Sequence, residues 1–260
     1  MLEWLLSKRG RLELDVACIS ERGLVRRDNQ DNLFIDRRRS VFAVADGMGG
    51  AQGGAKASEI VCTRLAEASE GARNFEDLMR KSADAISKAN HEIREYAYSA
   101  GYRQMGTTLV TLFVDNSGRN GAVLAHVGDS RAYRIRGGTL ERLTHDHTIA
   151  GELSRRSSCR GLLEELQGRA GPLSHVLTRA VGIEETVLAD WRRVDIHPGD
   201  IYLLCSDGVY DMLPDKALAT VCNAPLASAH DIVTHIAKGV LAAGAEDNYT
   251  CIVIKAGERI

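Results

Sequence analysis

The sequence lacks several features that mark common functional classes. None of its six cysteines forms a Cys-x-x-Cys pair, so neither a zinc ribbon nor a disulfide framework is indicated. Aromatic residues make up 5% of the chain and the formal net charge is -2, which argues against a surface that binds nucleic acid. No apolar run approaches the roughly 20 residues that span a bilayer.

What remains is typical of a soluble globular protein. The chain has 260 residues, 44% of them hydrophobic, which is enough for a sizeable core, and no linker or internal repeat divides it. Its first residues are too few and too acidic, with Glu3, for a signal peptide, and buried free thiols in a reducing cytosol are expected. We therefore predict one monomeric, cytoplasmic domain over residues 1–260, without nucleic-acid or membrane partners.

Apolar periodicity predicts the secondary structure. Strands are expected at residues 12–20, 32–36, 40–45, 107–114, 122–127, 132–135, 140–143, 187–196, 201–205 and 250–255, and helices at residues 57–70, 75–98, 214–222 and 228–242. Turn residues separate the strands between 107 and 143, which predicts an antiparallel meander. Since regular β-α-β alternation is absent, an α+β domain with helices outside antiparallel sheets is favoured.

Two local features complete this prediction. Ser58 is placed to start the first helix. The charged stretch of residues 148–171 does not fit the regular pattern, and we expect it to form a flap with some helix.

The most informative segment follows the apolar run of residues 41–45. Asp46 stands where that strand ends, and Gly47, Gly49 and Gly50 follow it, so the backbone can turn sharply and approach a ligand. Such a segment can present the Asp46 carboxylate and a backbone carbonyl to one hard cation. A plain Asp-Gly turn is the alternative, whereas a dinucleotide-binding loop fails on the spacing of the glycines.

Three more aspartates lie at strand ends. Asp129 and Asp207 each closely follow an apolar strand, and Asp247 closely precedes the last one. A carboxylate at the mouth of a buried strand is costly unless it is paired or bound to a cation. Asp oxygens suit Mg²⁺ or Mn²⁺, whereas zinc more often recruits His or Cys. Together with Asp46, these residues favour a single oxygen-rich cation site.

The remaining polar candidates carry weaker signals. His145 and His147 flank Asp146; we interpret both as structural, with a role in the flap as the alternative, and His126 as a core residue of an apolar strand. Arg26 lies in a polar connection. It is either solvated surface or a planar donor fork for a phosphate dianion.

The segments that contain these residues resemble, in order and over nearly the whole chain, the bacterial metal-dependent (type 2C, PPM) Ser/Thr protein phosphatases. The matching segments are residues 23–31, 44–50, 105–108, 127–131, 143–147, 176–182, 206–208 and 247–250. The resemblance implies a four-layer αββα sandwich, in which two central antiparallel sheets are flanked by helices and a flap lies near the active site.

The resemblance also implies the roles of the aspartates. Asp46 would bridge two Mn²⁺ or Mg²⁺ ions, the Gly47 carbonyl would bind one of them, and Asp207 and Asp247 would complete the other. Asp129, with Asp207, would hold a third ion. Asp46, Asp207 and Asp247 would thus be the catalytic residues, since a hydroxide bridging two ions would attack the phosphorus in line.

Other residues would assist. By the same resemblance, Arg26 would bind the substrate phosphate, and Gln30 and Asp31 would lie behind the ions, with Asp31 orienting water. Gln30 stands where many relatives have Glu. Met48 stands where eukaryotic relatives have the His proposed as the general acid, so a metal-bound water or solvent would protonate the leaving oxygen.

The function implied is hydrolysis of phosphoserine and phosphothreonine in proteins, opposing a bacterial Ser/Thr kinase. The alternative is a pseudophosphatase that binds phosphoproteins or another partner without turnover. The full set of aspartates argues against that alternative, because loss of one metal ligand is the simplest route to inactivity.

Overall fold

The computed structural model describes residues 12–115, 121–155, 175–224 and 228–258. Its strands are β1 (Leu12–Glu21), β2 (Asp31–Asp36), β3 (Val41–Met48), β4 (Gly106–Thr107), β5 (Leu109–Asp115), β6 (Gly121–Val127), β7 (Arg131–Arg136), β8 (Thr139–Arg142), β9 (Asp190–Asp195), β10 (Ile201–Cys205) and β11 (Tyr249–Glu258). Its helices are α1 (Ala51–Gly71), α2 (Phe75–Ala100), α3 (Ile149–Ser154), α5 (Asp207–Tyr210), α6 (Asp215–Cys222) and α7 (Ala229–Ala242).

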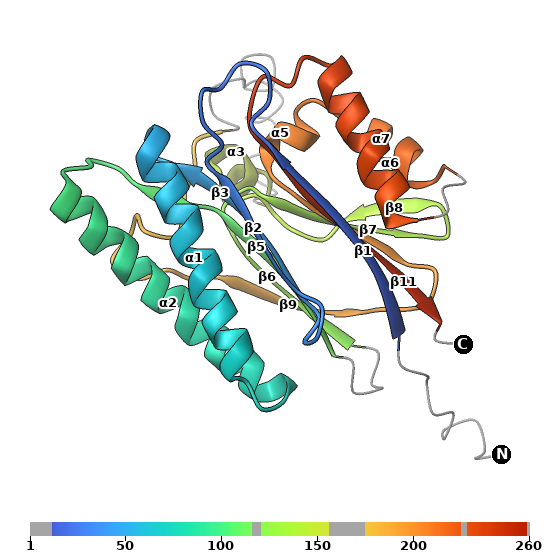
Figure 1. Ribbon diagram of the computed structural model, residues 1–260, viewed down its shortest axis with the longest axis horizontal. Helices are drawn as coiled ribbons and strands as arrows, with labels where there is room; N and C mark the ends of the chain where they lie inside the picture. The colour runs from blue at the N-terminus through green and yellow to red at the C-terminus, as the bar shows by residue number, and fades with distance from the viewer. Residues whose placement is uncertain (1–11, 116–120, 156–174, 225–227, 259–260) are drawn as a thin grey trace.

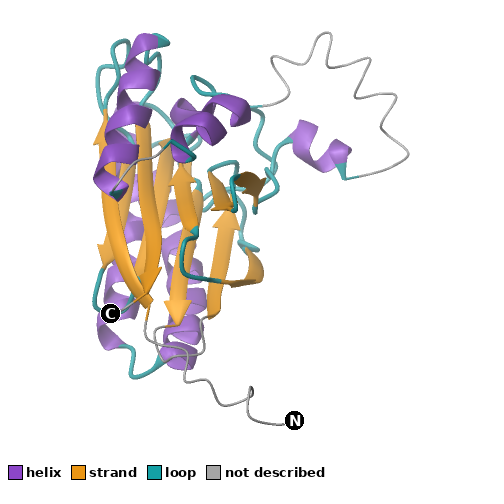
Figure 2. Cartoon of the chain, turned by 90° about the vertical axis from the view of Figure 1, so that its right-hand side faces the viewer, coloured by secondary structure: helices purple, strands orange, loops and turns teal. Residues whose placement is uncertain are grey.

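The strands form two antiparallel sheets that pack face to face (Figure 1). One sheet has the strand order β1-β11-β10-β7-β8, and the other has the order β2-β3-β5-β6-β9 with β4 paired to β3. Helices α1 and α2 cover the outer face of the second sheet, and α6 and α7 cover the outer face of the first, as the two views agree (Figures 1 and 2). The predicted four-layer αββα sandwich is confirmed.

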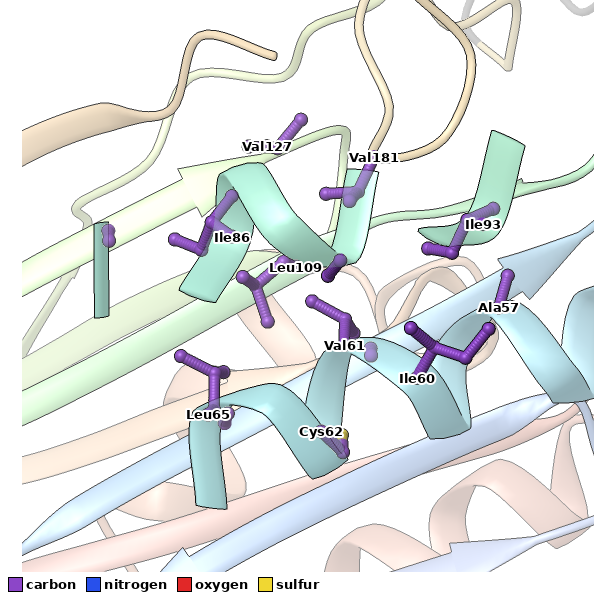
Figure 3. Packing of buried hydrophobic residues seen from close by; sticks show 14 of the residues in the cluster. Ala57, Ile60, Val61, Cys62, Leu65, Ile86, Ile93, Leu109, Val127 and Val181 are labelled. Carbon is purple, nitrogen blue, oxygen red and sulfur yellow. The ribbon is translucent and has the colours of Figure 1, made fainter. Parts of the chain in front are cut away.

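Three clusters of buried apolar side chains hold these layers together. One lies between the sheets and contains Phe42, Leu112 and Leu204. The other two lie beneath the helix pairs, and Figure 3 shows the one in which Val61 of α1 and Ile86 of α2 pack over the sheet. Strand β5 is buried along its whole length, because its sheet is covered on both faces. Burial of this apolar surface is the main force that joins the layers.

The first helix begins earlier than predicted. It starts at Ala51, directly after the glycine loop, so Ser58 lies inside the helix and does not cap it. Its hydroxyl donates to a backbone oxygen of the β1–β2 connection at 2.7 Å. The first turn shows no apolar periodicity because its residues must be small. A Cβ on Gly54, for example, would lie 2.7 Å from the backbone oxygen of Gly47.

The predicted meander is wrong. β5 and β6 pair in one sheet, whereas β7 and β8 pair in the other, so the chain crosses between the sheets after β6. Gly128 makes this crossing with a φ of +96°, and a Cβ there would lie 2.7 Å from the side chain of Thr108. Asp129 is part of the crossing, which brings it close to Asp46 and Asp207.

The cysteines follow the prediction with one exception. Cys62, Cys205, Cys222 and Cys251 are free and buried, but Cys18 is exposed, because β1 is an edge strand of its sheet. Cys159 lies outside the described residues.

Of the predicted flap, residues 148–155 belong to the described part of the chain, and residues 156–171 lie outside it. Residues 148–155 contain α3, which is capped by Thr148, whose hydroxyl accepts from the amide of Gly151 at 3.0 Å. Among the described helices, none has the length and apolar character needed to cross a membrane.

Replacing Leu204 by Ala should strongly destabilise the fold, because this side chain is fully buried between the sheets. The free energy of unfolding, measured by urea denaturation, should fall by about 2–5 kcal/mol. The control is Leu241→Ala in α7, at a side chain that is 44% exposed, where a loss below about 1 kcal/mol is expected. Equal losses in the two variants would contradict the layer assignment.

Candidate metal centre

The predicted carboxylates gather at one end of the sandwich, where strands of both sheets end. Asp31 begins β2 and faces Asp46 of β3 in the strand register. Asp207 begins α5 directly after β10, and Asp247 lies just before β11. Asp129 reaches the group from the crossing between the sheets, close enough to Asp46 and Asp207 to affect their charge. The structure thus brings together all five aspartates that the sequence singled out.

Burial, and then the charges of neighbouring carboxylates, raise the pKa values of Asp31, Asp46, Asp129 and Asp207. Burial, followed by the charges of Asp31, Asp207 and Asp129, raises the pKa of Asp46 well above its ordinary value. Burial and then Asp207 raise the pKa of Asp129 to about 8. Burial is also the main cause that raises the pKa of Asp31 to about 7. Such a group is costly to keep ionised unless a cation neutralises it.

The donor atoms fit hard divalent cations. Oδ1 of Asp31 is buried and, among the described residues, has no hydrogen-bond partner, while its Oδ2 accepts from Ser206 Oγ at 2.7 Å. Gly47 is buried beside Asp46, and a Cβ there would lie 2.1 Å from the backbone oxygen of Gly54, so only glycine fits. Carboxylate and carbonyl oxygens are the ligands that Mg²⁺ and Mn²⁺ favour.

The backbone of Asp46 is fixed by the two threonines that follow the second helix. Thr108 donates its amide to the Asp46 carbonyl at 2.8 Å and accepts the Asp46 amide with its hydroxyl at 3.0 Å. Thr107 Oγ1 also donates to that carbonyl, at 2.9 Å. Every backbone polar group of Asp46 is therefore paired, and the carboxylate projects from a rigid support.

Gln30 lies directly behind the glycine loop. With its amide oriented so that Nε2 faces acceptors, it donates to the carbonyls of Gly47 and Gly50 at 3.2 Å each. A carboxylate could not donate in this way. The amide therefore suits this chain, in which the glycine loop presents its carbonyls to residue 30.

Arg26 lies at the rim of the carboxylate group. Its Nη2 donates to Oδ2 of Asp247 at 2.6 Å, and this hydrogen bond, with the nearby charges of Asp207 and Asp46, raises its pKa. The side chains of the pair are 52% and 35% exposed, so the pair contributes little to folding stability. An exposed guanidinium at this place can reach a phosphate group in front of the carboxylates.

Sequence reasoning did not assign a role to Asn248, which fixes the connection that carries Arg26. Its Nδ2 donates to the carbonyls of Arg22 (2.8 Å) and Asp28 (2.9 Å), and its Oδ1 accepts the amide of Gln30 (2.9 Å). The available signal was its position directly after Asp247. An Asn there can both donate and accept, which an Asp cannot.

Two groups of potential ligands lie next to this centre. They are His175 with Asp207 and Asp211, at its exposed side, and His126 with His147 and Asp190, behind Asp129. His126 and His147 are buried, as expected for structural histidines, whereas His145 is exposed.

Comparison with known proteins identifies the family. The sequence matches the family model of protein phosphatase 2C over residues 20–239. The chain belongs to the protein phosphatase 2C family. The predicted family and enzyme class, a metal-dependent Ser/Thr protein phosphatase, are thereby confirmed, and phosphorylated proteins are the substrate class.

Individual type 2C phosphatases resemble this chain over nearly their whole length. Protein phosphatase PhpP of Streptococcus pneumoniae is 30% identical over 253 residues, which cover 94% of this chain and 98% of the relative. The structure of PppA, a regulatory component of the T6SS in Pseudomonas aeruginosa, has a TM-score of 0.81 at 30% identity and covers 94% of this chain and 97% of its own.

A third comparison bears on the cofactor. The catalytic domain of the protein phosphatase PstP, solved in complex with two manganese ions, has a TM-score of 0.77 at 29% identity and covers 95% of this chain and 100% of its own. The predicted dependence on Mn²⁺ or Mg²⁺ is confirmed at the level of the family.

Asp129→Asn should change how stability depends on pH in EDTA. The folded pKa of Asp129 is raised to about 8 from 3.8, so between about pH 5 and about pH 8 the folded state keeps a proton that the unfolded chain has released. Stability from this group is present at low pH and is lost as the pH rises through the folded value, by at most about 1.4 kcal/mol per pH unit.

The measurement is urea denaturation at each pH. The wild type should lose stability relative to Asp129→Asn as the pH rises, whereas Asp84→Asn, at an exposed site of α2, should follow the wild type. Parallel pH profiles for wild type and Asp129→Asn would refute the prediction.

Proposed function

We propose that this chain hydrolyses phosphoserine and phosphothreonine in proteins with two Mn²⁺ or Mg²⁺ ions held by Asp46, the Gly47 carbonyl, Asp207 and Asp247. Asp129, with Asp207, would hold a third ion. The observation that carries this proposal is the convergence of these carboxylates from both sheets on one end of the sandwich, where burial, and then neighbouring carboxylates, raise the pKa values of Asp46, Asp129 and Asp207.

The ions supply Lewis-acid chemistry: when bound, they polarise phosphoryl oxygens and lower the pKa of water. The protein supplies position. The Arg26 guanidinium binds phosphoryl oxygens from the rim and stabilises their charge as the reaction proceeds. Asp31, fixed by its hydrogen bond from Ser206 at 2.7 Å, orients the attacking water, with Gln30 supporting the glycine loop beside it.

The side chains around the centre support water as the nucleophile. Cys205 ends the strand that leads to Asp207, but it is fully buried, and burial raises the pKa of its thiol well above the ordinary value. It therefore offers no thiolate for attack. Water is therefore the nucleophile: a new P–O bond forms from its oxygen as the bond between phosphorus and the Ser or Thr oxygen breaks. Met48 has no proton to give, so the departing oxygen takes its proton from solvent.

The same proposal includes the setting of the enzyme. One type 2C domain over residues 1–260 acts as a monomer in the cytoplasm and opposes a bacterial Ser/Thr kinase. The relatives support turnover rather than binding alone, because they are named as phosphatases. The unbroken set of carboxylates supports the same choice over the pseudophosphatase alternative.

Asp46→Asn tests the catalytic assignment. With Mn²⁺, the wild type should hydrolyse both an aryl phosphate and a phosphothreonine peptide, and EDTA should abolish both activities. Asp46→Asn should lower kcat by on the order of a hundredfold or more, because it removes a central anionic ligand. Asp84→Asn is the matched control and should retain activity. A wild type that is inactive with Mn²⁺ would favour the pseudophosphatase.

Arg26→Ala tests phosphate binding. At saturating Mn²⁺, KM for the phosphothreonine peptide should rise by a factor that corresponds to about 1.5–3 kcal/mol, the strength of a charge-assisted hydrogen bond, with a smaller effect on kcat. Arg27→Ala, at the exposed neighbouring arginine, serves as the control. An unchanged KM in Arg26→Ala would remove Arg26 from this role.

A further inference from the structure

A pair of buried histidines lies behind the metal centre and takes no part in the reaction described above. The rings of His126 on β6 and His147 are stacked, with centroids 4.6 Å apart and an interplanar angle of 25°. His147 is fully buried, and its Nε2 has no hydrogen-bond partner within accepted geometry among the described residues. Burial, together with neighbouring His126 and Arg179, lowers the pKa of His147 to about 4, so the ring is neutral.

The hydrogen bonds of His147 argue against a metal at this group. Nδ1 of His147 accepts the backbone amide of Gly128 at 3.1 Å, so the proton of the neutral ring must sit on Nε2. This N–H faces Oδ2 of Asp190 at 3.4 Å. A cation at Nε2 would need the lone pair that the proton occupies, and Arg179 and Arg155 already approach Asp190, at 2.7 Å and 3.8 Å.

What His147 does contact is the residue directly before Asp129. Besides accepting the Gly128 amide, His147 donates its own amide to the Gly128 carbonyl at 3.0 Å. Both backbone polar groups of Gly128 are therefore bound to one residue. Gly128 has a φ of +96° and no room for a Cβ, so the direction in which the chain leaves it, and hence the position of Asp129, depends on these two bonds.

The other side of His147 is tied to segments next to the predicted flap. Its carbonyl accepts the amide of Thr178 at 2.8 Å. Asp190, which faces its Nε2, accepts from Arg179 Nη1 at 2.7 Å, and Nη2 of the same arginine donates to Glu152 of α3 at 3.4 Å. An unbroken series of contacts thus runs from α3 through Arg179, Asp190 and His147 to the crossing that carries Asp129.

We propose that His147 is a positioning residue that holds Gly128, and through it the Asp129 carboxylate, in register with Asp207 for the third cation. The series of contacts from Glu152 makes this position sensitive to the segments on either side of the flap. This inference rests on the role of Asp129 in the proposed function. The side chain itself touches neither substrate nor metal.

The chain offers a matched pair of substitutions. In His147→Asn, Oδ1 occupies the same bonded position as Nδ1 and can accept the Gly128 amide. In His147→Gln, the acceptor lies one bond further out, and the Gly128 amide is left unpaired. Both variants lose the ring and its stacking on His126, so a role in packing alone would affect them equally. Asp129→Asn provides the reference for loss of the third ion.

The measurement is binding of Mn²⁺ alone, by calorimetry and by electron paramagnetic resonance of the free ion, with melting temperatures recorded in EDTA. At the weakest class of Mn²⁺ sites, the dissociation constant of His147→Asn should lie within about threefold of the wild-type value. His147→Gln should lose tenfold or more at that class of sites only, like Asp129→Asn, and its melting temperature in EDTA should lie below that of His147→Asn because a buried amide is left unpaired. Equal Mn²⁺ binding by the two His147 variants would overturn the proposal.

Two further outcomes keep the test decisive. If His147→Gln does not fold, Asp190→Ala replaces it: this side chain is 34% exposed, and its loss frees Nε2 of His147. Severalfold weaker binding of Mn²⁺ by Asp190→Ala at the same class of sites supports the proposal, and unchanged binding contradicts it. If Asp129→Asn itself binds Mn²⁺ like the wild type, the assignment of Asp129 in the proposed function fails instead.

Discussion

Repulsion among crowded carboxylates, some buried and some half-buried, at one end of the sandwich is the constraint on which the rest of the structure depends. Beyond burial, Asp207 and Asp129 raise the pKa of Asp46, and Asp207 raises the pKa of Asp129, so their proximity opposes folding. The apolar layers beneath them provide the opposing free energy, and short hydrogen bonds fix the backbones that carry the charges. Thr108 holds both backbone polar groups of Asp46, which shows how closely the supports of the site are specified.

The sequence predicted much of this because the relevant signals are local. A strand that is apolar from residue 41 to residue 45 and then breaks at Asp46-Gly47 must expose its carboxylate at the edge of a layer. The spacing of apolar residues also located both long helices, and the ordered segments gave the family. In α1 this approach failed at the first turn, where contact with the glycine loop demands small residues such as Gly54, and small residues carry no periodicity.

What could not be predicted depends on contacts between segments distant in the chain. Short strands separated by turns resemble a meander whether or not they share a sheet, so the crossing at Gly128 was not foreseen. Likewise, Arg26 was assigned to phosphate, but its hydrogen bond to Asp247 joins residues 221 positions apart. The role of Asn248 and the tautomer of His147 follow only from donors and acceptors that the fold brings together.

The centre is assembled across the boundary between the two sheets. Asp31 and Asp46 come from one sheet and Asp207 follows a strand of the other, and Ser206 joins them by donating to Asp31 at 2.7 Å and accepting the amide of Thr250 at 3.0 Å. Sliding of one sheet past the other by a single residue spacing, about 3.3 Å, would separate these carboxylates by a comparable distance. Catalytic activity therefore depends on the relative position of the two sheets. A shift between them would lower the activity while every strand is still folded.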